Sequence, residues 1–251
     1  MIFKSKSLYL LFLVVGLIIL ITGCSVLKTA LHHDYDVKTY GETNENKDYV
    51  IVFHGIYGKF EDMNMIAESL SKEGYNVISV QYPTNSDNIE EITEKYIKPV
   101  VDGLDKDIKV NFVVHSMGSG ILRYYLKNNN LENMGKVVFI SPPSHGSALS
   151  DNPISSILKE PLGKVVSQFS TKEGSFVNKL GDPDYSCYVI MGNKSNNPLY
   201  SAMIPGKDDG MVPVDSAKLD TCDYKVIGGL THTSILKDKE TISEVEKYFS
   251  N

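Results

Sequence analysis

The chain has 251 residues, of which 42% are hydrophobic and 22% are charged, and its formal net charge is −6 at pH 7. This composition is typical of a globular protein with one core, and it excludes collagen-like and disordered chains. The acidic balance also excludes the basic surface with which nucleic-acid-binding proteins contact phosphates.

The first residues predict an export signal that is not part of the fold. Lys4 and Lys6 precede the apolar run 8–21, and small residues then lead to Cys24. A basic start, an apolar middle and small residues before a cleavage point are typical of secretory signal peptides. An uncleaved membrane anchor is the alternative, but the apolar run is short for a membrane span.

The segment around Cys24 is similar to the lipobox of bacterial lipoproteins, in which the cysteine is lipidated and becomes the first residue after cleavage. This resemblance implies that residues 1–23 are a signal peptide and that Cys24 carries lipid. We therefore expect an extracytoplasmic protein, lipid-anchored to the bacterial cell membrane. Residues 24–47 are predicted to be a polar tether, and residues 48–251 a single domain.

Short apolar runs alternate with amphipathic stretches over the rest of the chain. Runs of Val, Ile and Phe without polar alternation are typical of parallel strands buried on both faces. The predicted strands are Tyr49–Phe53, Asn76–Gln81, Val110–His115, Lys136–Ser141, Ser186–Met191 and Tyr224–Ile227. The predicted helices are Glu61–Glu73, Ile89–Leu104, Ser119–Asn129 and Thr241–Phe249. This order predicts an α/β fold with one doubly wound, mostly parallel sheet of about six strands.

The first predicted strand ends in a glycine-containing turn, residues 54–58, with the sequence His-Gly-Ile-Tyr-Gly. Such a turn exposes backbone N–H groups, and acyl transfer needs these donors to stabilise an oxyanion. We assign the predicted oxyanion hole to the N–H groups of Ile56 and Met117. A glycine turn without a catalytic role is the alternative.

The third predicted strand runs into His115-Ser116-Met117-Gly118. A strand, a serine and small residues that begin a helix are typical of a nucleophile elbow, in which a strained turn raises the serine hydroxyl above the sheet. Val114 stands where the usual G-x-S-x-G pattern has its first glycine. An ordinary Ser-Gly turn after a buried strand is the alternative.

Residues 150–184 form a long connection that contains three prolines and only weak helical pattern. Long connections in compact domains are usually functional, as lids or binding loops. We therefore predict a small helical cap over the active site. A plain pair of surface helices is the alternative.

A serine nucleophile needs an adjacent base, and the base needs an acid that orients it. His232 is the favoured base, because it follows the last predicted strand and precedes the last helix; His145 is the alternative. Asp209 is the favoured acid, because a glycine after it lets the backbone turn sharply; Asp208 is the alternative. With Ser116 upstream, these residues form a predicted catalytic triad.

Cys187 and Cys222 are the two cysteines that are left once Cys24 is assigned to lipid. In an oxidising compartment they can pair, while two buried thiols are the alternative. No metal or organic cofactor is predicted. Asp182 and Asp184 are more typical of a solvated acidic loop than of a calcium site.

These segments resemble the lipase/esterase branch of the α/β-hydrolases over most of residues 49–250. The most specific matches are residues 54–58, 113–118, 140–147, 208–213 and 231–233. The resemblance implies an α/β-hydrolase fold with Ser116, Asp209 and His232 as its triad. It also implies a substrate site lined by residues of the matched segments, for which we take His54, Gly55, Tyr57 and His145.

The expected function is hydrolysis of carboxylic esters with acyl or lipid-like groups, through an acyl-enzyme intermediate, at the outer face of a bacterial membrane. Acyl transfer or thioester cleavage on the same triad is one alternative. A non-catalytic surface binding protein with a hydrolase fold is another.

Overall fold

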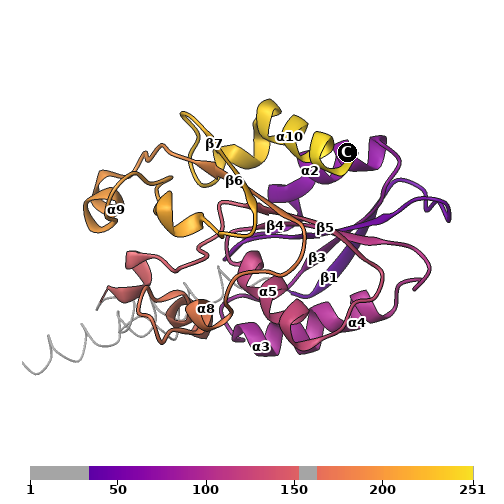
Figure 1. Ribbon diagram of the computed structural model, residues 1–251, viewed down its shortest axis with the longest axis horizontal. Helices are drawn as coiled ribbons and strands as arrows, with labels where there is room; N and C mark the ends of the chain where they lie inside the picture. Colours follow the sequence, from indigo (N-terminus) through magenta and orange to yellow (C-terminus); the bar gives the residue numbers. More distant parts are fainter. Residues whose placement is uncertain (1–33, 153–162, 251) are drawn as a thin grey trace, which may run out of the picture.

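The computed structural model describes residues 34–152 and 163–250. Within these residues seven strands form one sheet, in the order β1-β3-β2-β4-β5-β6-β7 (Figure 1). β1 is antiparallel to β3, and every other neighbouring pair is parallel. The predicted doubly wound, mostly parallel sheet is therefore confirmed. The strands are β1 (Asp36–Tyr40), β2 (Tyr49–Phe53), β3 (Asn76–Gln81), β4 (Val110–His115), β5 (Met134–Ile140), β6 (Cys187–Gly192) and β7 (Asp223–Ile227).

All six predicted strands are present in the sheet. β2, β3 and β4 have the predicted bounds, and the ends of the other three differ by one or two residues. β4 is buried at every position, as expected for a central parallel strand between two helical layers.

β1 was not predicted, and it occupies part of the predicted tether, at residues 36–40. Asp36–Tyr40 pairs with β3 at the edge of the sheet, where only the Tyr40 side chain is buried. The hydrophilic turn that follows is fixed by Asn76, whose side-chain amide donates to the carbonyls of Asn44 (2.7 Å) and Lys47 (2.6 Å). An edge strand faces water along most of its length, so its polar composition resembles that of a linker.

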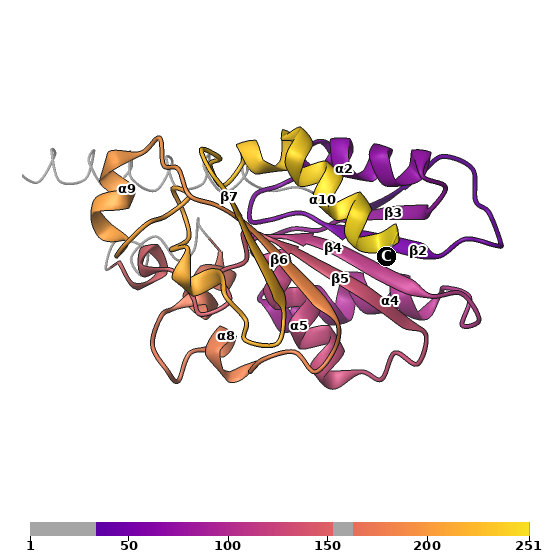
Figure 2. The same ribbon diagram turned by 45° about the horizontal axis from the view of Figure 1, so that its top comes forward.

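Helices cover both faces of the sheet (Figure 1), and Figure 2 shows the two layers from another side. α2 (Phe60–Lys72) and α10 (Lys239–Ser250) pack on one face. The other face carries α5 (Gly118–Asn128) and the continuous segment 89–102. That segment comprises α3 (Ile89–Ile92), the π-helical turn η1 (Thr93–Ile97) and α4 (Lys98–Asp102). Short helices in the connections are η2 (Ala148–Asp151), η3 (Lys164–Phe169), α8 (Phe176–Lys179), α9 (Pro198–Met203), η4 (Asp215–Ala217) and η5 (Ser234–Lys237).

The carboxyl ends of the parallel strands β2 to β7 lie along one side of the sheet, which we call the site edge. The loops that follow β2, β4, β5, β6 and β7 leave the sheet there, and these loops hold the predicted oxyanion, nucleophile, acid and base residues. Open α/β sheets place their ligands at this edge.

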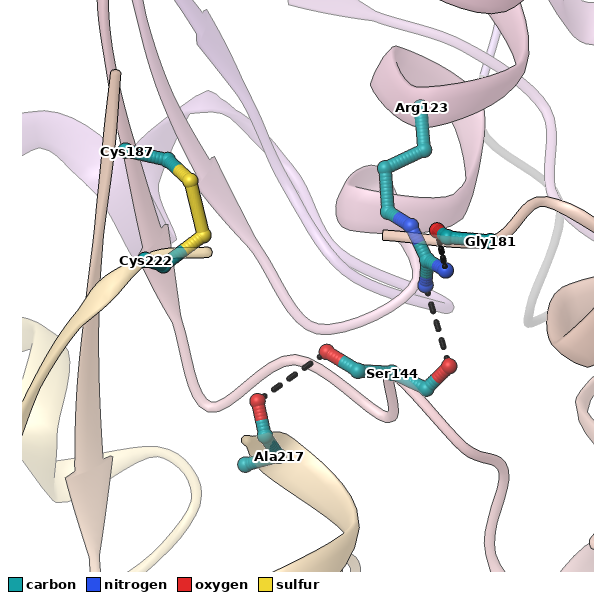
Figure 3. The surroundings of a disulfide bond; sticks show 6 residues. All are labelled: Arg123, Ser144, Gly181, Cys187, Ala217 and Cys222. Atoms are coloured by element: carbon teal, nitrogen blue, oxygen red, sulfur yellow. Dashed lines mark hydrogen bonds between the residues drawn. A yellow bond between two sulfur atoms is a disulfide. The ribbon is translucent and has the colours of Figure 1, made fainter. Parts of the chain in front are cut away.

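A disulfide joins Cys187 and Cys222 at the start of β6 and just before β7 (Figure 3). Of the two alternatives left open by the sequence, the paired one is therefore present. The bridge lies at the edge opposite the site edge, because both cysteines lie at the amino ends of parallel strands.

Removing the bridge is expected to lower the free energy of unfolding by about 4 kcal/mol, because the two cysteines are 35 residues apart and the bridge restricts the unfolded chain over that loop. Urea unfolding of the wild type and of the Cys187→Ser/Cys222→Ser variant measures the difference. A reductant should reproduce the loss in the wild type and leave the variant unchanged. A loss below about 1 kcal/mol would show that the loop is already restricted without the bridge.

Candidate active site

Ser116 lies in the tight turn between β4 and α5. Its φ of 52° is in the left-handed region, which residues other than glycine rarely adopt. The Ser116 N–H donates to the carbonyl of Ile140 (2.9 Å), and its carbonyl accepts from the Ser119 hydroxyl (2.7 Å). A strained serine held by its neighbours between a strand and a helix has the geometry of a nucleophile elbow.

Val114 departs from the usual elbow pattern without disturbing the turn. Its side chain is fully buried, and it pairs in register with Phe53 of β2 and Phe139 of β5. The close approach at the elbow is instead made possible by Gly55 of the facing loop. A Cβ atom on Gly55 would lie 2.9 Å from His115 Nδ1 and 3.0 Å from Ser116 Cβ.

His232 connects the serine to an acid. Its Nε2 lies 2.8 Å from Ser116 Oγ, and its Nδ1 lies 2.8 Å from Asp209 Oδ2. The carboxylate accepts, so Nδ1 carries the proton and Nε2 accepts from the serine hydroxyl. All three side chains are buried, and the three residues come from loops that follow β4, β6 and β7.

Asp209, and not Asp208, faces the histidine. The other carboxylate oxygen of Asp209 accepts from the N–H groups of Met211 (3.0 Å) and Val212 (2.9 Å). Asp208 Oδ1 instead accepts from the hydroxyl of Ser201 in α9 (3.0 Å). Of the two candidates for the acid, the geometry selects Asp209.

The charge of Asp209 is stabilised by these contacts. Burial by itself raises the pKa of a carboxyl group, but His232 and the two backbone N–H donors outweigh it and hold the Asp209 pKa below its usual range. Asp209 is therefore ionised at neutral pH. Its backbone carbonyl also accepts from the His232 N–H (2.8 Å), which joins the acid and base loops at a second point.

The predicted oxyanion donors flank the nucleophile. Ile56 and Met117 line the same pocket as Ser116 and His232. Neither N–H donates to another atom of the described residues, so both are available to an oxyanion. Tyr57, the residue after Ile56, has a φ of 55°, and its N–H donates to the hydroxyl of Thr84 (3.0 Å), which fixes the turn.

Ser116 and His232 open onto a pocket of about 420 Å³. Its walls are made mostly by apolar and aromatic side chains, together with the polar residues Ser147, Ser150 and Asn152. Those walls include Tyr57, Pro143, Leu149, Val166, Phe169, Tyr200, Met203, Met211 and Val212. Such a pocket fits an acyl chain or another apolar group beside the serine.

Of the four predicted substrate-contacting residues, Tyr57 alone lines this pocket. His54 is buried behind it, stacked on Tyr82, and its Nε2 accepts from the Tyr82 N–H (3.2 Å). Gly55 packs against the elbow. His145 is exposed, with Nδ1 3.3 Å from Asn178 Oδ1. The structure therefore does not place His54, Gly55 or His145 in the wall of this pocket.

The described parts of the predicted cap, residues 150–152 and 163–184, do reach the pocket, where Ser150, Asn152, Val166 and Phe169 form part of its wall. Residues 153–162 lie outside the described residues. The segment is attached to the nucleophile helix by the buried Arg123 of α5. Arg123 donates to the carbonyls of Ser144 (3.0 Å) and Gly181 (2.7 Å) (Figure 3).

The sequence model of the family described as "Putative serine esterase (DUF676)" matches residues 43–143. This span includes Ile56, Ser116 and Met117, and it ends before Asp209 and His232. No curated protein matches the chain.

Solved structures match over most of the chain. Lipase BlEst2 of Bacillus licheniformis, in its mature form, has a TM-score of 0.64 at 20% identity, over 86% of this chain and 97% of that protein. The α/β hydrolase MGS-MChE2, from a sediment metagenome of the Mar Chica lagoon in Morocco, has a TM-score of 0.62 at 14% identity, over 87% and 95%. The chain has the α/β-hydrolase fold. Phospholipase PlaB of Legionella pneumophila has a TM-score of 0.62 at 16% identity, over 81% of this chain and 63% of PlaB.

One buried histidine of this α/β-hydrolase fold makes a contact that was not predicted from the sequence. The His115 Nε2–H donates to the backbone carbonyl of His232 (2.9 Å), and the two rings lie 4.7 Å apart. Burial, together with the nearby His232, lowers the His115 pKa to about 3, so His115 remains neutral. Its place at the end of β4, beside the nucleophile, is the sequence signal that could have revealed this contact.

His115 is expected to make the protein less stable in mild acid. An unfolded histidine takes up a proton with a pKa near 6.5, whereas folded His115 stays neutral down to about pH 3, so stability falls as the pH drops from 6.5. At pH 5 this amounts to about 2 kcal/mol. His115→Gln keeps an N–H donor but has no titrating ring, so its free energy of unfolding should fall less between the two pH values, by this amount. Urea unfolding at pH 7.5 and pH 5 measures it, and identical pH profiles for the two proteins would contradict the assignment.

Other predictions concern residues that the structure does not describe. The predicted signal peptide, residues 1–23, and the lipidation site Cys24 lie outside the described residues. Over residues 34–152 and 163–250, no helix is both long and apolar enough to span a bilayer. The same residues hold no cluster of three metal-binding side chains.

Proposed function

We propose that the protein is a serine hydrolase that cleaves carboxylic esters. The observation that carries this proposal is the continuous chain from Ser116 Oγ through the imidazole of His232 to the Asp209 carboxylate, with both contacts at 2.8 Å, beside an apolar pocket. The resemblance of residues 43–143 to a serine esterase family supports it. So does the fold shared with a lipase and a phospholipase.

The arrangement supports a two-step reaction. Ser116 Oγ attacks the ester carbonyl carbon while its proton passes to His232 Nε2, and the carbonyl oxygen becomes an oxyanion that the N–H groups of Ile56 and Met117 stabilise. The oxyanion then collapses and the carbon–oxygen bond to the alcohol breaks. The alcohol leaves with the proton from His232, and the acyl group stays on Ser116.

Water completes the cycle by the same route. It attacks the acyl carbon, gives a proton to His232 and forms a second oxyanion. Collapse of this intermediate breaks the bond to Ser116 Oγ, which recovers the proton, and the carboxylic acid leaves. Asp209 remains ionised throughout and stabilises the imidazolium.

We further propose that the protein is held at the outer face of a bacterial membrane by lipid on Cys24. The basic start, the apolar run and the lipobox-like residues before Cys24 support this location. The disulfide between Cys187 and Cys222 also suits an oxidising compartment.

Labelling with a fluorophosphonate probe tests the proposal, because such probes react with an activated serine. The wild type should be labelled, with the label on the peptide that contains Ser116, and folded Ser116→Ala should not. A folded wild type that stays unlabelled, with and without detergent, would favour the non-catalytic binding protein.

Acyl transfer and thioester cleavage remain alternatives on the same residues. They are separated from ester hydrolysis by product analysis with an ester, a thioester and an added alcohol acceptor. Free carboxylic acid as the main product from the ester would support hydrolysis, and transfer to the alcohol would favour an acyltransferase.

A further inference from the structure

α9 presents apolar side chains to solvent at the mouth of the pocket. Leu199 is 76% exposed, Tyr200 40% and Met203 39%, and the last two also line the pocket. α9 lies at one end of the molecule, on the left in Figure 1 and in Figure 2. Contiguous exposed apolar side chains on a soluble domain are typical of an interaction surface.

Polar contacts hold α9 in this orientation. The Asn197 side chain accepts from the N–H groups of Leu199 (3.1 Å) and Tyr200 (3.2 Å) and so caps the helix. The Ser201 hydroxyl donates to Asp208, the neighbour of the acid Asp209. The three apolar side chains are thus displayed by a helix that is fixed to the catalytic loop.

The first described residues, like the catalytic loops, lie at the site edge of the sheet. Asp36, the first residue of β1, pairs with Gln81, the last residue of β3, and the Gln81 side chain donates to the carbonyl of Asp34 (3.1 Å). β3 is parallel to β2, so its last residue lies at the site edge. The residue after it, Tyr82, donates through its hydroxyl to the carbonyl of His54 (2.6 Å), beside the oxyanion loop.

The length of chain before Asp34 limits how far the domain can move from a lipid on Cys24. Nine residues lie between the two positions, and the ten Cα-to-Cα steps of a fully extended chain span at most about 35 Å. Five strand spacings separate β1 from β6, the strand before α9, which is about 24 Å at the usual spacing. A lipid on Cys24 can therefore reach along the site edge as far as the end of β6, from which the chain continues into α9.

We propose that the site edge faces the bilayer that holds the lipid anchor, that Leu199, Tyr200 and Met203 insert among its acyl chains, and that the substrate is an ester lipid drawn from this bilayer. This inference rests on the proposed ester hydrolysis and on lipidation of Cys24. The surface is apolar and the chain has a net charge of −6. Insertion therefore depends on apolar burial and needs no anionic lipid.

The chain contains no tryptophan, so one introduced tryptophan reports on one position. Leu199→Trp is compared with Met65→Trp, at a residue of α2 that is 43% exposed. Both are made in the full, lipidated chain with Ser116→Ala, so that the protein does not hydrolyse the vesicle lipid. In vesicles of zwitterionic phosphatidylcholine with brominated acyl chains, emission at position 199 should be quenched at least twofold and shifted to the blue, and emission at position 65 should not. Equal quenching at both positions, or none at 199, would overturn the orientation.

A second pair of variants tests the route of the substrate. Leu199→Glu and Met65→Glu add the same charge, and neither residue lines the pocket. Both should hydrolyse a short, water-soluble ester within twofold of the wild type, while Leu199→Glu alone should lower hydrolysis of ester lipid in the vesicles at least fivefold. Equal rates on vesicle lipid for both variants would overturn this route. A wild type that cleaves neither ester would instead refute the proposed hydrolysis. If Cys24 proved to carry no lipid, the proposed anchor would be refuted, and with it the proposed orientation.

Discussion

Ser116→Ala and His232→Ala are each expected to lower kcat on a soluble ester by about 10⁴–10⁶-fold, and the double variant should be no slower than the slower single variant. The two side chains act as one unit, because the serine is a poor nucleophile unless His232 Nε2, 2.8 Å away, takes its proton. Steady-state kinetics of the three variants measures the effect. KM should change little, since neither side chain supplies the apolar walls of the pocket.

His145→Ala is the matched control for this experiment. His145 is the other loop histidine considered as the base, and it is exposed, with its ring beside Asn178. Its loss should change kcat less than threefold. A large loss in His145→Ala, or independent and multiplicative losses in the Ser116/His232 pair, would contradict the assigned roles.

Asp209→Asn is expected to lower kcat by about 10⁴-fold with little change in the fold. An asparagine oxygen can still accept from the N–H groups of Met211 and Val212. Its NH₂ group would then face His232 Nδ1, which favours the tautomer with the proton on Nε2. That tautomer cannot take the proton of Ser116. Kinetics at saturating ester, with circular dichroism to verify folding, measures the effect.

The adjacent residue provides the control. Asp208→Asn keeps an oxygen that can accept from the Ser201 hydroxyl and from the Gly210 N–H, where Asp208 Oδ1 now accepts at 3.0 Å and 2.7 Å. The variant should therefore retain activity within about tenfold. Equal losses of kcat in Asp208→Asn and Asp209→Asn would contradict the assignment of Asp209 as the acid.

The sequence was sufficient to predict the central sheet and the chain order of the serine, aspartate and histidine that meet at its site edge. β2 and most of β4 are apolar because helices cover both faces of the sheet, and this leaves a clear pattern in the chain. Ser116, Asp209 and His232 were predictable because each follows a strand of that sheet. The choice between Asp208 and Asp209 needed the structure, since adjacent side chains in the same loop point to different partners.

Features that depend on contacts between distant segments were not predictable. β1 has a polar sequence because it lies at an edge, so only its pairing with β3 identifies it as a strand. The turn around His54 has the composition of a binding loop, yet its histidine packs inward against Tyr82. The role of α9 in the pocket follows from the path of the chain after β6, for which local pattern gives no signal.

β1 determines where the gene can be shortened to produce the domain. The family match begins at residue 43 and the predicted tether ends at residue 47, so a recombinant chain designed on either boundary would begin after β1. It would lack Asp36–Tyr40 and leave the backbone N–H and C=O groups of β3 unpaired along a sheet edge. Exposed strand edges of this kind pair with other chains and aggregate. A soluble form should therefore begin before Asp34, so that the Gln81 side chain keeps its contact with the Asp34 carbonyl and the sheet keeps β1 as its edge strand.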